Sequence, residues 1–198
     1  MVVAFYLSQD WNSLLEMEVS SILAQKSVAS TQEGLALYDQ LEVIDADFML
    51  GRWKGTEFPS NHPMDGLLEI SGWYGKAFLD TENVHPLLFY TSDKKGLYAV
   101  NPTLVFPFAK MNLPSFIIPY LKALAKPFVL TKRSKARLRM IEYRGKVSAT
   151  MQYDHLPIND VFRKIDENTV LGAMDMKGEK QPYFFLLERD NTTYNGQY

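Results

Sequence analysis

The sequence predicts a mainly β fold, a closed, lipocalin-like antiparallel barrel of about eight to ten strands with a few helices. Short runs rich in aromatic and aliphatic residues recur at regular spacing between turn signals. The alternation of strand and helix that a parallel sheet requires is not seen in the sequence. The C-terminal third alternates apolar and polar residues with a period of two, which is typical of strands with one buried face.

The strand-like runs extend from residue 50 to residue 189. They are LGRWKGTEF at 50–58, KAFLD at 76–80, PLLFYT at 86–91, LYAVNP at 97–102, RLRMIEY at 137–143, KVSATMQY at 146–153, DVFRKID at 160–166, TVLGAMDM at 169–176 and PYFFLLER at 182–189. In KVSATMQY, the alternation predicts one inward set of side chains and one set that faces solvent. The inward set is Val147, Ala149, Met151 and Tyr153, and the outward set is Lys146, Ser148, Thr150 and Gln152.

Residues 1–30 are predicted to form an N-terminal helical extension, with one helix over about 11–26. A second helix is expected to begin after Ser30 or Thr31, with Glu33 in its first turn. We expect these helices to pack against the barrel wall or its open end. The alternative is that they form a lid or a surface for a partner.

Residues 102–130 interrupt the strand pattern. Five prolines stand among aromatic and aliphatic residues in this segment, which argues against a central strand. The segment is predicted to be an insertion that contains a loop and a short helix near 115–126. It is either a flap over the barrel mouth or a packed surface insertion, and the sequence favours neither.

Length and composition are those of one folded domain, and the barrel is expected to occupy residues 31–198. The chain has 198 residues, 46% of them apolar, and 21 basic residues against 23 acidic ones. The formal charge of −2 disfavours nucleic acid as a partner. No apolar run reaches the length of a membrane span and no signal peptide is visible, so we expect a cytoplasmic protein. The sequence leaves a homodimer open.

Several separated motifs carry a resemblance to a known family. They are GRWKG at 51–55, HPMDG at 62–66, GWYGKAF at 72–78, HPLLF at 85–89, the run from 143 to 166 and LGAMDMKG at 171–178. Together they resemble the bacterial and fungal GXWXG-domain proteins with their paired C-terminal domain of unknown function. A Gly-x-Trp strand is also similar to that of the calycin barrels, the lipocalins and fatty-acid-binding proteins. This resemblance implies an interior cavity and a tryptophan, here Trp53, that closes the barrel base.

No metal or organic cofactor is expected. The chain has no cysteine, which excludes Cys-ligated zinc and iron–sulfur sites. The histidines His62, His85 and His155 lack the spacing of a helical zinc site. The sequence also contains no phosphate loop, dinucleotide fingerprint or nucleophile elbow.

Three residues are the candidates for chemistry if the protein is an enzyme: Lys76, His85 and Asp175. Lys76 can bind a carbonyl or carboxylate if it points inward, and His85 can transfer a proton near neutral pH. Asp175 either faces water by alternation, which we expect, or lies in the cavity with a raised pKa. Asp160 is interpreted as a turn or cap residue.

The ligand-binding residues are predicted to be mostly aromatic side chains and methionines that line one dominant cavity. They are Trp73, Lys76, His85, Tyr143, Met151, Tyr153, Phe162 and Met174. The alternative for the apolar members is ordinary core packing, because inward residues of a small barrel either fill it or contact its contents.

Two functions fit this sequence. The first is a protein that binds a small, largely apolar molecule of the lipid, terpenoid or polyketide class in the barrel. The second is an enzyme that needs no cofactor and uses the same cavity for acid–base chemistry, as an isomerase, cyclase or hydratase. Fold alone does not separate them. An interaction module built on the N-terminal helices ranks last.

Overall fold

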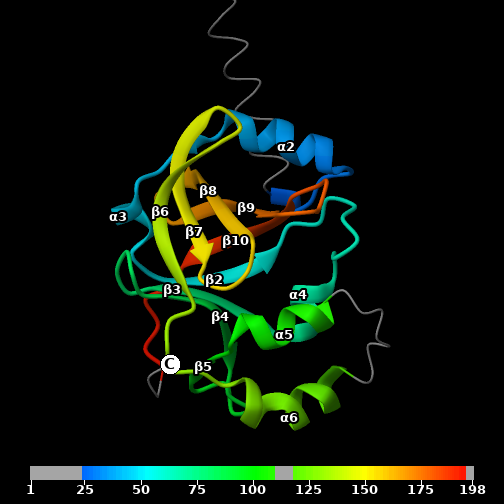
Figure 1. Ribbon diagram of the computed structural model, residues 1–198. Helices are drawn as coiled ribbons and strands as arrows, with labels where there is room; N and C mark the ends of the chain where they lie inside the picture. Colours follow the sequence, from blue (N-terminus) through cyan, green and yellow to red (C-terminus); the bar gives the residue numbers. More distant parts are fainter. Residues whose placement is uncertain (1–23, 110–117, 195–198) are drawn as a thin grey trace, which may run out of the picture.

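Eight antiparallel strands close into a barrel in the computed structural model, which describes residues 24–109 and 118–194 (Figure 1). The barrel strands are β2 (Gly51–Glu57), β3 (Trp73–Phe78), β4 (Val84–Tyr90), β6 (Ala136–Tyr143), β7 (Lys146–Tyr153), β8 (Ile158–Asp166), β9 (Thr169–Met176) and β10 (Tyr183–Arg189). Their order is β8-β7-β6-β4-β3-β2-β10-β9, and β9 pairs back with β8. The predicted fold class is therefore confirmed.

Two short strands complete the sheet outside this ring. β5 (Leu97–Ala99) pairs with β4, and β1 (Glu42–Val43) pairs with β8. The seam between β4 and β6 is narrow, with one registered pair, Val84 and Ala136. The Pro-rich segment leaves the barrel beside this seam, between β5 and β6.

Helix α2 (Thr31–Gln40) packs on the outer wall of the barrel, over β8, β9 and β10 (Figure 1). The Ser30 side chain accepts a hydrogen bond from the Glu33 amide, so the predicted helix start is confirmed. The Tyr38 hydroxyl donates to the Val161 carbonyl at 3.1 Å and ties the helix to the wall. The helix predicted over 11–26 lies almost entirely outside the described residues.

One end of the barrel is closed around Trp53, which is fully buried as predicted. Helix α3 (Ala46–Met49) crosses this end, and the Trp53 indole donates to the Met49 carbonyl at 2.8 Å. The Arg189 guanidinium lies 4.2 Å from the indole centroid. It also donates to the backbone carbonyls of Phe48 and Leu50. These contacts connect the first and last barrel strands at the base.

The other end carries the remaining helices. α4 (Leu67–Ser71) follows β2, and α5 (Pro102–Ala109) and α6 (Ile118–Val129) form the Pro-rich segment. The sequence predicted one short helix here and the structure has two. Pro102 occupies the first position of α5, where no amide partner is lost, whereas Pro107 and Pro127 lie inside α5 and α6. The Phe106 ring packs edge-on against Tyr153, so α5 borders the barrel interior.

The predicted faces of β7 are half right. Ala149, Met151 and Tyr153 lie in the interior cluster, as expected. Val147 is instead 50% exposed, while Ser148 and Thr150 are fully buried. The reason is that β1 enters where β7 and β8 separate: the Ile44 amide donates to Ser148 Oγ, and that hydroxyl donates to the Phe162 carbonyl at 2.6 Å. The segment after β1 thus covers Ser148 on the face that was predicted to meet solvent, whereas Lys146 on that face is exposed as predicted.

Candidate functional site

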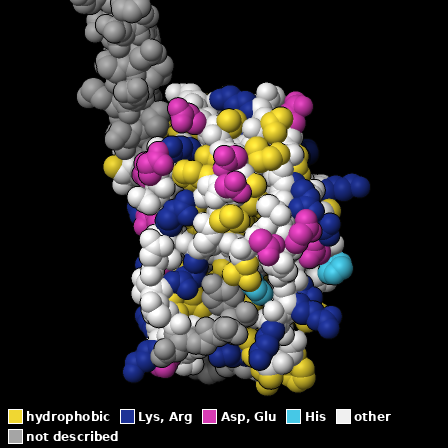
Figure 2. Space-filling view, turned by 90° about the vertical axis from the view of Figure 1, so that its left-hand side faces the viewer, with side chains coloured by type: hydrophobic (Ala, Val, Ile, Leu, Met, Phe, Trp, Pro, Cys, Tyr) yellow, Lys and Arg dark blue, Asp and Glu magenta, His cyan; other side chains and the backbone are white. Residues whose placement is uncertain are grey.

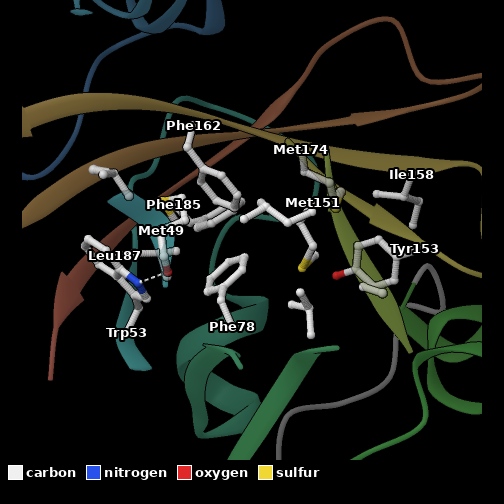
Figure 3. Packing of buried hydrophobic residues seen from close by; sticks show 14 of the residues in the cluster. Met49, Trp53, Phe78, Met151, Tyr153, Ile158, Phe162, Met174, Phe185 and Leu187 are labelled. Carbon is white, nitrogen blue, oxygen red and sulfur yellow. Dashed lines mark hydrogen bonds between the residues drawn. The ribbon is translucent and has the colours of Figure 1, made fainter. Parts of the chain in front are cut away.

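The barrel interior is apolar from its base to its middle. Side chains from many strands meet there, and Figure 3 shows them between Trp53 at one end and Tyr153 at the other. They include Met49, Phe78, Met151, Phe162, Met174, Phe185 and Leu187. Aromatic rings meet edge to face, as in the pairs of Phe162 with Phe78 and Phe185. This part of the barrel is a packed core.

A single ion pair is buried within this apolar interior, as far as the described residues show. The Lys76 ammonium on β3 lies 2.7 Å from Asp160 Oδ2 on β8. The two side chains are 3% and 1% exposed. Lys76 also donates to the Pro86 carbonyl at 3.3 Å. The pair thus joins β3 and β8, two strands that are 80 residues or more apart in the sequence.

Aromatic rings surround the ammonium on its other sides. Lys76 Nζ lies 5.0 Å from the ring centroid of Phe185, 5.4 Å from that of Trp73 and 5.8 Å from that of Tyr153. The faces of these rings carry partial negative charge and stabilise a cation that water cannot reach. We call Lys76, Asp160, Trp73, Tyr153 and Phe185 the interior polar site.

Part of the hydrogen-bonding capacity of the interior polar site has no partner among the described residues. Asp160 Oδ1 and Trp73 Nε1 are buried and make no hydrogen bond. An ammonium has three donors, and Lys76 directs two of them to oxygen atoms. Two donors and one acceptor thus lack partners within the apolar interior, although buried polar atoms are usually satisfied.

Burial also sets the protonation behaviour of this site. It raises the pKa of Asp160 above the usual range of a carboxyl, although Lys76 opposes the shift. Burial, followed by the nearby charge of Asp160, raises the pKa of the Tyr153 hydroxyl well above its ordinary value. Tyr153 is therefore a neutral hydroxyl at physiological pH.

A β-bulge brings Lys76 into the interior. Trp73 and Lys76 are three residues apart, so a regular strand would place them on opposite faces. The register between β3 and β4 shifts on both sides of Gly75, and both side chains consequently point inward. Gly75 has a φ of +145°, and a β-carbon there would stand 2.0 Å from the Trp53 carbonyl oxygen. Only glycine fits this position.

A hollow of about 420 Å³ lies at the barrel end next to this site. It is lined by Gly55, Thr56, Glu57, Pro59, Leu68, Glu69 and Trp73. Glu57 ties its wall together, because its carboxylate accepts from the amides of Gly66 and Leu68 and from the Tyr183 hydroxyl. Trp73 lines the hollow and also faces Lys76, so its ring separates the hollow from the ion pair.

Five of the predicted ligand-binding residues lie in the interior with Lys76. Trp73 and Tyr153 belong to the interior polar site, and Met151, Phe162 and Met174 pack beside it. Met151 and Met174 are the two direct cross-strand neighbours of Asp160. Among the predicted residues, Trp73 is the one that lines the hollow, which differs from the cavity of aromatics and methionines that we expected.

The two other predicted ligand-binding residues, His85 and Tyr143, and the candidate acid Asp175 point away from the interior. His85 pairs with Ala77, whose side chain belongs to an outer cluster, so the His85 side chain shares that outer face. Burial lowers the pKa of His85. Tyr143 packs against Tyr38 beneath α2, outside the barrel. Asp175 alternates outward between Met174 and Met176, as we expected.

Asp160 was misread from the sequence as a turn or cap residue. The strand starts at Ile158, two residues earlier than predicted, so Asp160 lies inside β8. The signal was present in the alternation Ile158, Asp160, Phe162, which places the carboxylate between two inward apolar side chains. It was missed because an Asn-Asp pair is also typical of turns.

Surface charges are largely mixed in sign, as Figure 2 shows for one face. Within the basic run at 132–139, Arg137 pairs with Asp154 at 2.9 Å and Arg139 with Glu82 at 2.6 Å. Two of the five basic residues in that run are thus paired with a carboxylate, which is typical of a solvated strand edge.

Among residues 24–109 and 118–194, no group of three or more His, Asp or Glu side chains is arranged to hold a metal ion. In the same residues, every helix is too short or too polar to cross a bilayer.

Comparison with known proteins identifies two family segments. Residues 36–94 match the family described as GXWXG protein, and residues 134–189 match a domain of unknown function, DUF4334. A crystal structure of a protein from Thermomonospora curvata is 33% identical in sequence, with a TM-score of 0.65. The match covers 89% of this chain and 98% of that chain. No protein with a curated description matches the sequence.

Proposed function

We propose that the barrel of this chain, which carries a GXWXG segment and a DUF4334 segment and belongs to one family with the Thermomonospora curvata protein, binds one small, largely apolar molecule. The observation that carries the proposal is the interior polar site, where two donors and one acceptor lack partners inside an apolar barrel. Groups of this kind orient a ligand whose remaining surface is apolar. Trp53 at the base supports the lipocalin-like character of the barrel.

The ligand enters, in this proposal, from the hollow beside Trp73. The path requires the Trp73 ring to rotate, because the ring separates the hollow from Lys76. Met151 and Met174 then make room, since their unbranched side chains adapt to irregular neighbours. The ligand classes that fit are lipids, terpenoids and polyketides with a carbonyl or hydroxyl group near one end.

The direct test is native mass spectrometry of the protein purified from its own host. We expect a retained small molecule that is released on denaturation. Titration with the apolar dye Nile red provides the second measurement. Met174→Trp fills the interior and should abolish dye binding, whereas Leu124→Trp adds the same ring at a site that is 74% exposed and should not. Dye binding by both variants at the wild-type level would place the dye outside the barrel and contradict the proposal.

The polar anchor is tested separately from the cavity. Lys76→Met should weaken binding of a carbonyl-containing ligand by about 1.5–3 kcal/mol, the usual contribution of a charged hydrogen bond. Asp175→Asn is the matched control, because that carboxylate points outward from β9. A Kd of Lys76→Met equal to that of the wild type would remove Lys76 from the site.

An enzyme that needs no cofactor is the second candidate. The observation that favours it is Asp160 Oδ1, a buried carboxylate oxygen without a partner, in a site where burial raises the pKa of the acid. Acid–base enzymes tune carboxyl groups in this way.

A further inference from the structure

The ion pair of the interior polar site is costly for the fold. Moving two charges out of water requires several kcal/mol per ion, which the mutual attraction offsets only when the remaining donors and acceptors are satisfied. Here Asp160 Oδ1 has no partner and Lys76 has one N–H without an oxygen acceptor among the described residues. Two apolar side chains would fill the same space at lower cost. Because the buried ion pair destabilises the fold, we expect its role to lie in function.

The unsatisfied groups define a complementary molecule. Lys76 and Trp73 offer donors, so the molecule must carry an acceptor oxygen. Asp160 Oδ1 offers an acceptor, so the molecule carries a hydrogen that this oxygen can accept, either in a hydrogen bond or as a transferred proton. The surrounding rings of Tyr153 and Phe185 require the rest to be apolar. A ketone with hydrogens on the adjacent carbon has these three properties.

We infer that the interior polar site takes enolisable ketones and transfers a proton at the carbon next to the carbonyl, with Asp160 as the base and Lys76 holding the oxygen. This inference rests on the proposed binding function and names its substrate class. It also assigns a catalytic role to Asp160, which the sequence alone did not suggest.

The step balances without a further reactant. Asp160 Oδ1 takes the proton, the C–H bond breaks, and its electron pair forms the C=C bond of an enolate. The carbonyl π electrons move to the oxygen, where the Lys76 ammonium stabilises the developing charge. Asp160 then returns the proton to the same carbon, or to the far carbon of a conjugated enolate, which isomerises a β,γ-unsaturated ketone. Lys76 remains an ammonium throughout.

Ring geometry around the pair supports this chemistry. The rings of Trp73, Tyr153 and Phe185 exclude water, which strengthens the electrostatic interaction between Lys76 and a developing oxyanion. A carboxylate with a raised pKa is a stronger base than one in water. The Trp73 N–H is a further buried donor without a partner in the interior polar site.

Deuterium exchange into 2-tetralone provides the test. The full-length protein and the ketone are mixed in buffered D2O, and proton NMR follows the loss of the signals next to the carbonyl. Line broadening of the aromatic signals reports binding in the same sample. We expect exchange at least a hundredfold faster than in buffer alone, the usual effect of a positioned base.

Variants assign the exchange to Asp160. Asp160→Asn cannot accept the proton and should exchange at the buffer rate, whereas Asp175→Asn should retain the wild-type rate. Because Asp160→Asn leaves Lys76 buried without a counter-charge, Lys76→Met/Asp160→Leu serves as a second variant without the base. Circular dichroism checks that each variant is folded. Wild-type exchange in either base-free variant would overturn the assignment.

The remaining outcomes separate this inference from the binding proposal. Bound 2-tetralone without accelerated exchange overturns proton transfer and leaves binding intact. The β,γ-unsaturated ketone 3-cyclohexen-1-one is tested for binding in the same way. If neither this ketone nor 2-tetralone binds while Nile red still does, enolisable ketones are not the substrate class. Failure of the dye as well contradicts the proposed function itself. A borohydride-trapped adduct on Lys76 would also overturn the mechanism, since it requires a neutral amine and a covalent imine.

Discussion

The Trp73 indole occupies the space in which a β-carbon at position 55 would stand. Such a β-carbon would lie 2.0 Å from Trp73 Cζ3, closer than any real contact. The second glycine of the GRWKG motif is thus explained by a ring on the neighbouring strand. The Trp73 ring also faces Lys76. Gly55 on β2 therefore makes room for the ring that forms one wall of the interior polar site.

Gly55→Ala should therefore destabilise the protein by about 1–3 kcal/mol, the usual cost of overpacking a rigid core. Urea denaturation measures the change. In a Trp73→Leu background the same substitution should cost less, because the clashing ring is gone, and the two changes should couple. Identical costs in both backgrounds would show that another neighbour excludes the β-carbon.

Trp53→Ala should lower the free energy of unfolding by about 3–5 kcal/mol, because the side chain is fully buried and its loss leaves a cavity at the barrel base. Phe128→Ala is the control, since Phe128 is 78% exposed and its loss should cost less than about 0.5 kcal/mol. A loss under about 1 kcal/mol for Trp53→Ala would contradict its role at the base.

Removing one partner of the interior ion pair should cost more than removing both. Lys76→Met leaves Asp160 buried without its cation and should destabilise the fold by about 3–5 kcal/mol. Lys76→Met/Asp160→Leu should be close to the wild type or more stable, because no charge remains in the apolar interior. Thermal or urea unfolding of the three proteins gives the comparison.

The surface pair of Arg137 and Asp154 is the matched control for this cycle. Both of its members are partly exposed, so Arg137→Met should cost less than about 1 kcal/mol. If the double variant at 76 and 160 were as unstable as Lys76→Met, the ion pair would be required for packing and the interpretation of its cost would be wrong.

His85 should make stability fall in mild acid. Burial lowers its pKa in the folded chain, so below about pH 6.5 the unfolded chain binds a proton that the folded chain resists. This contribution is complete above the unfolded pKa and is lost as pH falls from there towards the folded pKa. His85→Gln stays neutral, so the stability difference between wild type and variant should shift in favour of the variant between pH 7.5 and 5. A difference independent of pH would show that His85 titrates normally.

Local signals in the sequence were enough for the fold class and for several elements. The period of two identified the strands, and the Ser30 and Glu33 pattern located the start of α2. The resemblance of the Gly-x-Trp strand to that of the calycin barrels implied that Trp53 closes a barrel end, and Trp53 is fully buried. Such features depend on residues close together in the chain, so a pattern of a few residues predicts them.

The candidate site was only partly predictable. Inward residues such as Met151 and Phe162 follow from the alternation of their strands. Lys76 and Trp73, in contrast, share a face only because a bulge at Gly75 interrupts the alternation of β3. That bulge is recognised from the contact of Gly75 with the Trp53 backbone, which the sequence does not display. Tyr143 falls on the face of β6 opposite to the inward Ala136 and Leu138, and α2 covers it there.

By itself, then, the sequence determined which residues lie in strands, where a helix begins and that one end holds a buried tryptophan. Tertiary structure alone decided which charges meet. Asp160 becomes the partner of Lys76 when β8 closes the ring opposite β3, and Ser148 is buried when β1 enters beside β7. The periodicity of a strand specifies which of its residues share a face. Which residues of other strands they meet depends on the register and on the closure of the barrel, and both involve strands that are distant in the chain.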